Sequence, residues 1–226
     1  MNHTLSAHAP ASPGEEHTLS LWTERGEVVV RFHPSRGARA AVLMVGGVGG
    51  DWDTPAHDLY PRLCQELPAE GMAALRVRFR HATDLREAVY DVLAALRFLD
   101  EQGIERVVLL GHSFGGAVII QAAESSPEVT AVITLATQSY GTNAVSELGP
   151  ECAALLIHGL EDHVLPFWSS EHVYEMAREP RKLVFFPGNG HTLQESADAV
   201  HHLVHQWVIH YGRPRDEQEL APPPPP

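Results

Sequence analysis

A serine at position 113 lies in a Gly-x-Ser-x-Gly motif, a pattern that carries the nucleophile in many enzymes. The motif, Gly-His-Ser-Phe-Gly-Gly at residues 111–116, follows the apolar run 106–110 and leads directly into the apolar run 117–123. A buried strand, a tight turn and a helix are therefore expected without spare residues between them, which is the context of a nucleophile elbow. Such a turn strains the serine backbone and lifts the hydroxyl toward the free N–H groups of the helix. A glycine-rich turn without chemistry is the alternative.

A serine hydroxyl is a weak nucleophile at neutral pH and needs a general base that an acid orients. Two later segments offer these groups, since Asp162 follows the apolar run 153–159 and His191 follows another apolar run and a glycine-containing loop. The chain order of nucleophile, acid and base, each near a strand end, predicts a triad of Ser113, Asp162 and His191. Glu161 is the alternative acid.

With these three motifs the chain resembles the α/β-hydrolase superfamily over most of its length. The resemblance rests on the serine motif, on His-Gly-x-x-Asp-x-x-Leu-Pro at residues 158–166 and on Gly190-His191. It implies a Ser–His–Asp triad and an acyl-enzyme mechanism. It does not fix the substrate, because this fold serves esterases, lipases, thioesterases, amidases and dehalogenases.

The resemblance also implies an oxyanion hole with two backbone donors. One is the N–H of Phe114, the residue after the nucleophile. The other is assigned to Val48, within the Gly-Gly-Val-Gly-Gly stretch at residues 46–50 that follows the apolar run 40–45. The family's common His-Gly pair is Gly-Gly here, which leaves a backbone donor intact. A flexible turn or a phosphate loop is the alternative, and the absence of a following Lys-Ser/Thr disfavours the phosphate loop.

Apolar runs and helical periodicity alternate along the chain. Strands are expected at residues 19–23, 27–32, 40–45, 73–79, 106–110, 129–135, 153–159 and 182–186, and helices at 58–67, 84–101, 117–123, 167–177 and 192–210. This order predicts an α/β-hydrolase fold with a mostly parallel eight-stranded sheet and helices on both faces. The domain is expected over 17–212, with a disordered N-terminal tail at 1–16 and a Pro-rich C-terminal tail at 213–226.

A large cap domain is not expected, because only residues 137–151 separate two of the predicted strands. The site should therefore be open to small or otherwise accessible acyl groups. This argues against lipases with a mobile lid, and against epoxide hydrolases and dehalogenases, which also use an aspartate nucleophile. The dienelactone-hydrolase branch is similarly small and lidless, but its nucleophile is a cysteine where this chain has Ser113.

Arginines near the end of the fourth predicted strand are candidates for holding a substrate carboxylate. Strand alternation is expected to place Arg78 and Arg80 on the same side, although pairing with surface acids is the commoner role for such arginines. Gln138 and Tyr140, just past the sixth strand, and Trp52 are further candidates for lining the cleft. Simple packing is the alternative for both aromatic residues.

The composition disfavours several partners and locations. A net charge of −13 disfavours nucleic acids and anionic membrane surfaces. The first 17 residues lack the pattern of a signal peptide, and no apolar stretch is long enough to cross a bilayer. Cys64 and Cys152 are expected to be buried thiols without a disulfide framework. A reducing cytoplasm is therefore the expected location.

No cofactor and no metal are expected. His201 and His205 lie one helical turn apart, but no glutamate completes a His-Glu-x-x-His site, so a hydrated helix face is favoured. The sequence thus predicts a serine hydrolase that cleaves small-molecule carboxylic esters through an acyl-enzyme. A thioesterase or acyltransferase with the same triad is one alternative. The other is a non-enzymatic ligand-binding protein on a hydrolase fold, which would usually carry a damaged triad or oxyanion loop.

Overall fold

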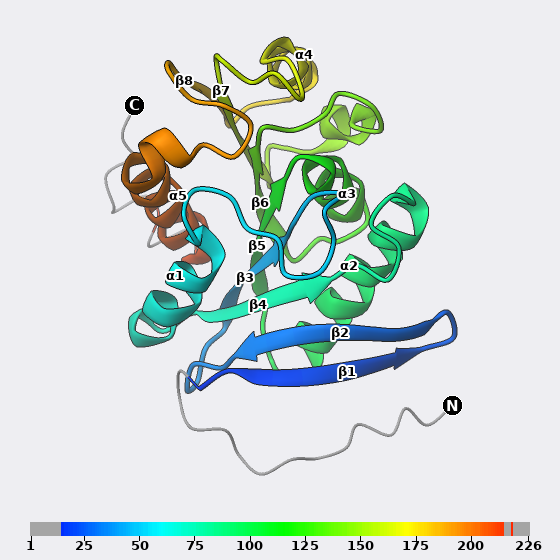
Figure 1. The fold of residues 1–226 in the computed structure, drawn as a ribbon. Coiled ribbons are helices and arrows are strands. Elements are labelled where there is room, and N and C mark those ends of the chain that lie inside the picture. The colour runs from blue at the N-terminus through cyan, green and yellow to red at the C-terminus, as the bar shows by residue number, and fades with distance from the viewer. Residues whose placement is uncertain (1–14, 215–217, 219–226) are drawn as a thin grey trace.

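The computed structural model describes residues 15–214 and Gln218, and most of the two predicted tails lies outside these residues. Eight strands form one sheet in the order β1-β2-β4-β3-β5-β6-β7-β8 (Figure 1). The strands are β1 His17–Thr23, β2 Gly26–His33, β3 Ala40–Val45, β4 Ala73–Arg78, β5 Arg106–His112, β6 Val129–Leu135, β7 Ala153–Gly159 and β8 Arg181–Phe186. Only the pairs β1/β2 and β2/β4 are antiparallel. The predicted mostly parallel eight-stranded sheet is confirmed.

Side chains alternate between two hydrophobic cores, one on each face of the sheet. In β3, Ala41, Leu43 and Val45 face one core, whereas Val42 and Met44 face the other. Helices α2, α3 and α4 cover the first face, and α1 and α5 cover the second (Figure 1). The helices are α1 Leu59–Glu66, α2 Leu85–Glu101, α3 Phe114–Glu124, α4 Trp168–Met176 and α5 Ala197–Gly212.

The last helix begins five residues later than predicted, at Ala197 rather than at 192. Leu193 is buried in a left-handed conformation with φ 55°, which stops a helix from running through it. The carbonyl of Thr192 instead accepts a hydrogen bond of 2.7 Å from the N–H of Ala56. These contacts hold the residues just after His191 in a turn that leads into a short 3₁₀ helix, Gln194–Ser196, and a local sequence pattern does not reveal them.

The carboxyl ends of the parallel strands meet at one edge of the sheet. Between β6 and β7 the chain has only a short loop with a single 3₁₀ turn, Asn143–Glu147, so the described chain carries no large cap domain over this edge. Among the residues that the structure describes, no helix combines the length and the apolar character that a bilayer crossing needs.

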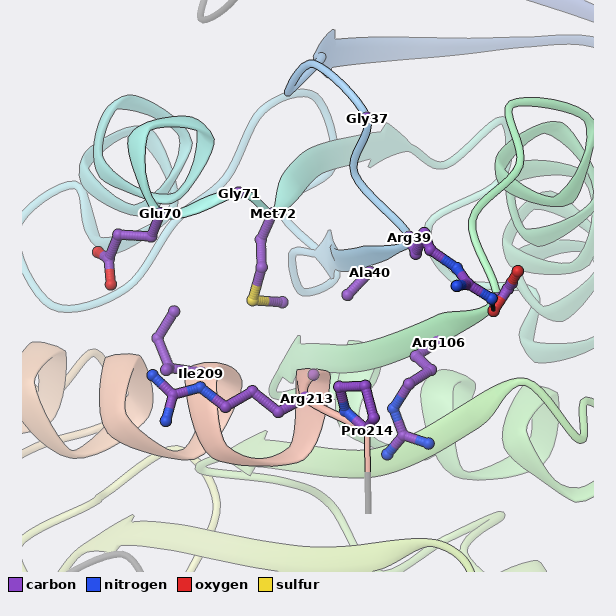
Figure 2. A pocket seen from close by; sticks show the side chains of 12 residues that line it. Gly37, Arg39, Ala40, Glu70, Gly71, Met72, Arg106, Ile209, Arg213 and Pro214 are labelled. Atoms are coloured by element: carbon purple, nitrogen blue, oxygen red, sulfur yellow. Dashed lines mark hydrogen bonds and ion pairs between the residues drawn. The ribbon is translucent and has the colours of Figure 1, made fainter. Parts of the chain in front are cut away.

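A cavity of about 1060 Å³ lies at the opposite edge, where β3 and β5 begin (Figure 2). The residues that line it come from the strand starts and the end of α5: Gly37, Arg39, Ala40, Glu70, Gly71, Met72, Glu105, Arg106, Ile209, Gly212, Arg213 and Pro214. Arg39 and Glu105 form an ion pair, and Arg106 donates a hydrogen bond to the carbonyl of Tyr211. Ser113 follows the other end of β5, so this cavity is separate from the predicted catalytic edge.

Candidate active site

Ser113 occupies a strained turn between β5 and α3. Its backbone has φ 55° and ψ −119°, a combination that non-glycine residues rarely adopt and that is found where a structure forces it. The Ser113 N–H donates to the carbonyl of Leu135, 2.8 Å away. A Cβ at Gly111 would collide with the carbonyl oxygen of Gly115, and a Cβ at Gly115 would collide with that of Gly46. The two motif glycines thus allow the crossing of segments that this turn needs.

Asp162 lies just after β7, and its side chain is fully buried. Its Oδ1 accepts hydrogen bonds from the N–H groups of Val164 and Leu165, at 2.8 and 2.9 Å. Its Oδ2 lies 2.7 Å from Nδ1 of His191. Burial alone would raise the pKa of Asp162, but these hydrogen bonds outweigh it and hold the pKa below its ordinary value. The carboxylate is therefore ionised and fixed in orientation.

His191 lies in the loop after β8, and 15% of its side chain is exposed. An ionised carboxylate accepts only, so the 2.7 Å contact places the proton of a neutral ring on Nδ1 and leaves Nε2 without one. Nε2 of His112 lies 3.1 Å from the His191 carbonyl oxygen, and the two rings are 4.8 Å apart between centroids. The residue before Ser113 therefore contacts His191, the predicted base.

The loops of the acid and the histidine are joined by their backbones. The N–H of Glu161 donates to the carbonyl of Asn189, 3.0 Å away, and a Cβ at Gly159 would collide with the same carbonyl. Glu161 itself is exposed, whereas Asp162 contacts the histidine. Of the two candidate acids, the geometry thus brings Asp162 to His191.

The glycine-rich loop after β3 lies against Ser113. A Cβ built on Gly47 would be 3.2 Å from the Cβ of Ser113. The Gly47 N–H donates to Oδ2 of Asp53 at 3.3 Å, so the Asp53 carboxylate holds this loop. Val48 follows with an exposed side chain, and Phe114 opens α3 with its ring packed edge-on against Phe79. The two predicted oxyanion donors thus belong to segments that meet at Ser113.

The candidate substrate contacts fall into separate environments. Trp52 has the guanidinium of Arg31 4.2 Å from its ring centroid and that of Arg78 5.9 Å away. Arg78 also lies 3.8 Å from the carboxylate of Asp51. Trp52 and Arg78 thus pack on each other beside the glycine-rich loop.

The other two candidates, Gln138 and Tyr140, follow β6. Gln138 donates a hydrogen bond of 2.8 Å to the Tyr140 carbonyl, and the Tyr140 side chain is exposed. This loop borders the same edge of the sheet as Ser113, because β6 pairs with β5.

Arg80 lies away from this group. Its Nε is 2.5 Å from Oδ1 of the fully buried Asp91, and its Nη2 is 2.9 Å from the carboxylate of Glu87. Both acids belong to α2, on the face of the sheet opposite Trp52. The expectation that Arg78 and Arg80 lie on the same side is therefore wrong, because β4 ends at Arg78 and strand alternation does not continue to residue 80.

The paired histidines of α5 bond to carboxylates. Nε2 of His201 lies 2.7 Å from Glu66, Nε2 of His205 lies 2.6 Å from Glu70, and the two rings stack. They face the same way, as their spacing predicts. His201 therefore joins α5 to the end of α1, and His205 joins α5 to the 3₁₀ helix Leu67–Glu70 that follows α1.

Sequence reasoning gave no role to three polar residues beside the triad. His112 contacts His191, Asp53 holds the glycine-rich loop, and the buried His158 lies 3.0 Å from Oδ2 of Asp162. The only sequence signal for His112 and His158 was their position within the serine motif at 111–116 and the motif at 158–166. Asp53 offered only its closeness in sequence to the glycines.

Comparisons with known proteins place this chain in a family. The sequence model of the alpha/beta hydrolase family matches residues 41–155. Over 119 residues the chain is 33% identical to the dihydrolipoyllysine-residue acetyltransferase component of the acetoin cleaving system of Cupriavidus necator, covering 50% of this chain and 30% of the relative. Over 112 residues it is 37% identical to Lipase LipV of Mycobacterium tuberculosis, covering 47% and 40%. The chain thus matches less than half the length of either curated relative.

A solved structure extends the likeness to the whole fold. The crystal structure of a dienelactone hydrolase from Anabaena variabilis superimposes with a TM-score of 0.76 at 23% identity, covering 88% of this chain and 99% of that one. At this identity the superposition shows a shared architecture. Because the family match spans just over half of the sequence and the fold agrees with it, the chain belongs to the alpha/beta hydrolase family.

Proposed function

We propose that this protein is a serine hydrolase that cleaves carboxylic esters through an acyl-enzyme, with Ser113 as nucleophile, His191 as base and Asp162 as acid. The observation that carries the proposal is the 2.7 Å contact between Asp162 Oδ2 and His191 Nδ1, set beside a serine at φ 55°. An ionised, fully hydrogen-bonded carboxylate fixes the tautomer of the histidine and stabilises its charged form.

The chemical steps follow from these roles. His191 Nε2 takes the Ser113 proton as Oγ attacks the ester carbonyl, and the backbone N–H groups of Val48 and Phe114 stabilise the oxyanion. The tetrahedral intermediate collapses as the alcohol leaves with a proton from His191. Water, deprotonated by the same histidine, then attacks the acyl-enzyme and releases the acid and Ser113.

Exposed apolar side chains beside the triad favour esters with an apolar acyl group. Val48 follows the glycine that approaches Ser113, and Val164 donates its N–H to Asp162, yet their side chains are 57% and 69% exposed. Tyr140, in the loop after β6, and Trp168, the first residue of α4, add exposed aromatic surface. A substrate that covers this surface would gain binding energy from each apolar contact.

The open edge also suits an acyl acceptor other than water, which keeps acyl transfer as a second candidate; thioester cleavage by the same triad differs from ester cleavage only in the leaving thiol. No cap domain covers the carboxyl ends of the described strands, so an alcohol or thiol has the same access as water. Product analysis in the presence of an added alcohol distinguishes the two outcomes, because transfer yields a new ester and hydrolysis yields the free acid.

The proposal is tested by trapping the acyl-enzyme. Wild type and Ser113→Ala are mixed with p-nitrophenyl butyrate, quenched in acid within milliseconds to seconds, and weighed by intact-protein mass spectrometry. We expect one butyryl group on Ser113 of the wild type, formed at the rate of the p-nitrophenol burst. Equal acylation and turnover in the Ser113→Ala variant would refute the proposed nucleophile.

A further inference from the structure

A second histidine contacts the catalytic acid from inside the protein. His158 is the second-last residue of β7, which is buried along its whole length, and its side chain is fully shielded from solvent. Its Nε2 atom lies 3.0 Å from Oδ2 of Asp162 and 3.0 Å from the carbonyl oxygen of Leu165. Its Nδ1 atom lies 2.6 Å from the hydroxyl of Ser170, a residue of α4 that is also fully buried.

These contacts determine where the proton of the His158 ring lies. The carboxylate of Asp162 and the carbonyl of Leu165 only accept hydrogen bonds, so Nε2 carries the hydrogen. Burial lowers the pKa of His158 below its ordinary value, which favours the neutral ring. In a neutral ring with hydrogen on Nε2, Nδ1 is an acceptor, and the Ser170 hydroxyl is placed to donate to it.

His158 is linked to the proposed triad through a single atom, Oδ2 of Asp162. Oδ2 of Asp162 accepts from Nδ1 of His191 at 2.7 Å and from Nε2 of His158 at 3.0 Å. Without the Ser170 hydroxyl, Nδ1 of the buried ring would lose its hydrogen-bond partner, and the ring would no longer be held from the α4 side. Its Nε2–H would then be free to shift from the Asp162 carboxylate toward the Leu165 carbonyl, and the carboxylate would lose one of the donors that orient it.

We propose that Ser170 and His158 are positioning residues for the triad: the Nε2–H of His158 holds Asp162 Oδ2 toward His191, and the Ser170 hydroxyl, by donating to Nδ1, holds the His158 ring in place for this contact. The inference rests on the proposed ester hydrolysis for its kinetic part. Its tautomer part depends only on the hydrogen-bond geometry. Ser170 is twelve residues from His158 and acts from a helix that itself carries no group of the triad.

The experiment compares Ser170→Ala with Ser169→Ala in the full chain. Ser169 is the adjacent buried serine of the same helix, and its backbone N–H bonds to Pro166, so its substitution removes a hydroxyl from the same turn without touching His158. For Ser170→Ala we expect kcat on p-nitrophenyl butyrate to fall about tenfold with KM within about twofold, as for a lost buried hydrogen bond. For Ser169→Ala we expect kcat near the wild-type value.

A spectroscopic measurement reads the tautomer directly. In protein labelled with ¹⁵N-histidine, long-range ¹H–¹⁵N correlation spectra should show His158, assigned with a His158→Gln variant, as the Nε2–H tautomer in the wild type. In Ser170→Ala the Nε2–H tautomer should persist, because Asp162 and Leu165 still only accept, while the Nδ1 resonance should shift with the loss of its hydrogen-bond donor. An Nδ1–H tautomer in the wild type, or equal kcat in the two serine variants, would overturn the inference. A wild type that shows the expected tautomer without ester turnover would instead refute the proposed function.

Two substitutions of His158 keep the test open if Ser170→Ala does not fold. A glutamine amide has an N–H that can replace the Nε2 donor, whereas a leucine of similar bulk has none. We therefore expect kcat of His158→Gln to exceed that of His158→Leu by several-fold at similar thermal stability. Equal values for the two variants would contradict a role in orienting Asp162.

Discussion

Nε2 of His112 lies 3.1 Å from the carbonyl oxygen of His191. The residue that precedes the proposed nucleophile thus contacts the backbone of the proposed base, and their rings are also adjacent. The two segments are 79 residues apart in sequence. The position of His191 beside the elbow therefore depends on a side-chain contact as well as on the order of the strands.

Replacing the acid should abolish most of the turnover. We expect Asp162→Asn to lower kcat by roughly 10³–10⁴-fold, because the amide can donate to His191 and favour the wrong tautomer. The matched control is Glu161→Gln, which removes the exposed neighbouring carboxylate and should change kcat little. Steady-state kinetics on a p-nitrophenyl ester measure both. A large loss in Glu161→Gln together with an active Asp162→Asn would reverse the assignment of the acid.

Acid should destabilise the fold through the same carboxylate. Burial opposes its ionisation, but the hydrogen bonds from His191, Leu165 and Val164 hold the pKa of Asp162 below its ordinary value of 3.8. Folding therefore favours the charged form, and this stabilisation is full above the ordinary pKa and is lost as the pH falls through the lower folded-state value. In urea denaturation, the difference in free energy of unfolding between wild type and Asp162→Asn should shrink below about pH 4. A difference that stays constant down to acid pH would contradict this.

Arg80 should matter for stability and not for substrate binding. Arg80→Met leaves the fully buried carboxylate of Asp91 without its guanidinium partner, and we expect a loss of about 3 kcal/mol in the free energy of unfolding. The control is Arg78→Met, whose side chain is 43% exposed and 3.8 Å from an exposed aspartate, so its loss in stability should be under about 1 kcal/mol. Denaturant titration measures both, and equal losses would refute the distinction.

Gly115 and Gly190 should differ sharply in their tolerance of a methyl group. A Cβ at Gly115 would collide with the carbonyl of Gly46, so Gly115→Ala should lower the free energy of unfolding by about 1–3 kcal/mol and reduce turnover by displacing the elbow. Nothing lies within 4 Å of a Cβ at Gly190, so Gly190→Ala should fold with nearly unchanged stability. Thermal unfolding compares them, and similar melting temperatures would count against the steric argument.

The exposed apolar rim should set the preference for acyl chain length. We expect kcat/KM to rise several-fold from p-nitrophenyl acetate to the hexanoate, since each methylene that is buried contributes up to about 0.8 kcal/mol. Val164→Ser keeps the N–H that bonds to Asp162 and should flatten this rise. Trp22→Ser, which alters an equally exposed residue on the distant β1, should not. A rise of the same size in Val164→Ser would exclude Val164 from the acyl contact.

Features that depend on local pattern were predictable from the sequence. The apolar runs gave all eight strands, and Asp84 caps α2 by accepting from the Glu87 N–H at 3.1 Å, where the predicted helix begins. The strain of Ser113 follows from its motif in the same way, because a strand and a helix leave no other conformation for the turn between them.

Features that depend on distant contacts were not predictable. Arg80 is held by Glu87 and Asp91 and by the carbonyl of Arg25, 55 residues away. Strand alternation alone therefore gave the wrong prediction that Arg80 lies on the same side as Arg78. The delayed start of α5 depends on a hydrogen bond between Thr192 and a loop far earlier in the chain. No local sequence pattern indicates a role for Ser170, because its contact with His158 depends on how α4 packs on β7.

The central claim is that Ser113 is an activated nucleophile, and a fluorophosphonate probe tests it most directly. Wild type, Ser113→Ala and His191→Ala are treated with the probe and weighed by intact-protein mass spectrometry over time, with circular dichroism to establish that each is folded. The account predicts rapid single labelling of the wild type, no labelling of Ser113→Ala, and labelling of His191→Ala slowed by orders of magnitude. A folded wild type that takes up no probe, or a Ser113→Ala variant labelled at the same rate, would contradict it.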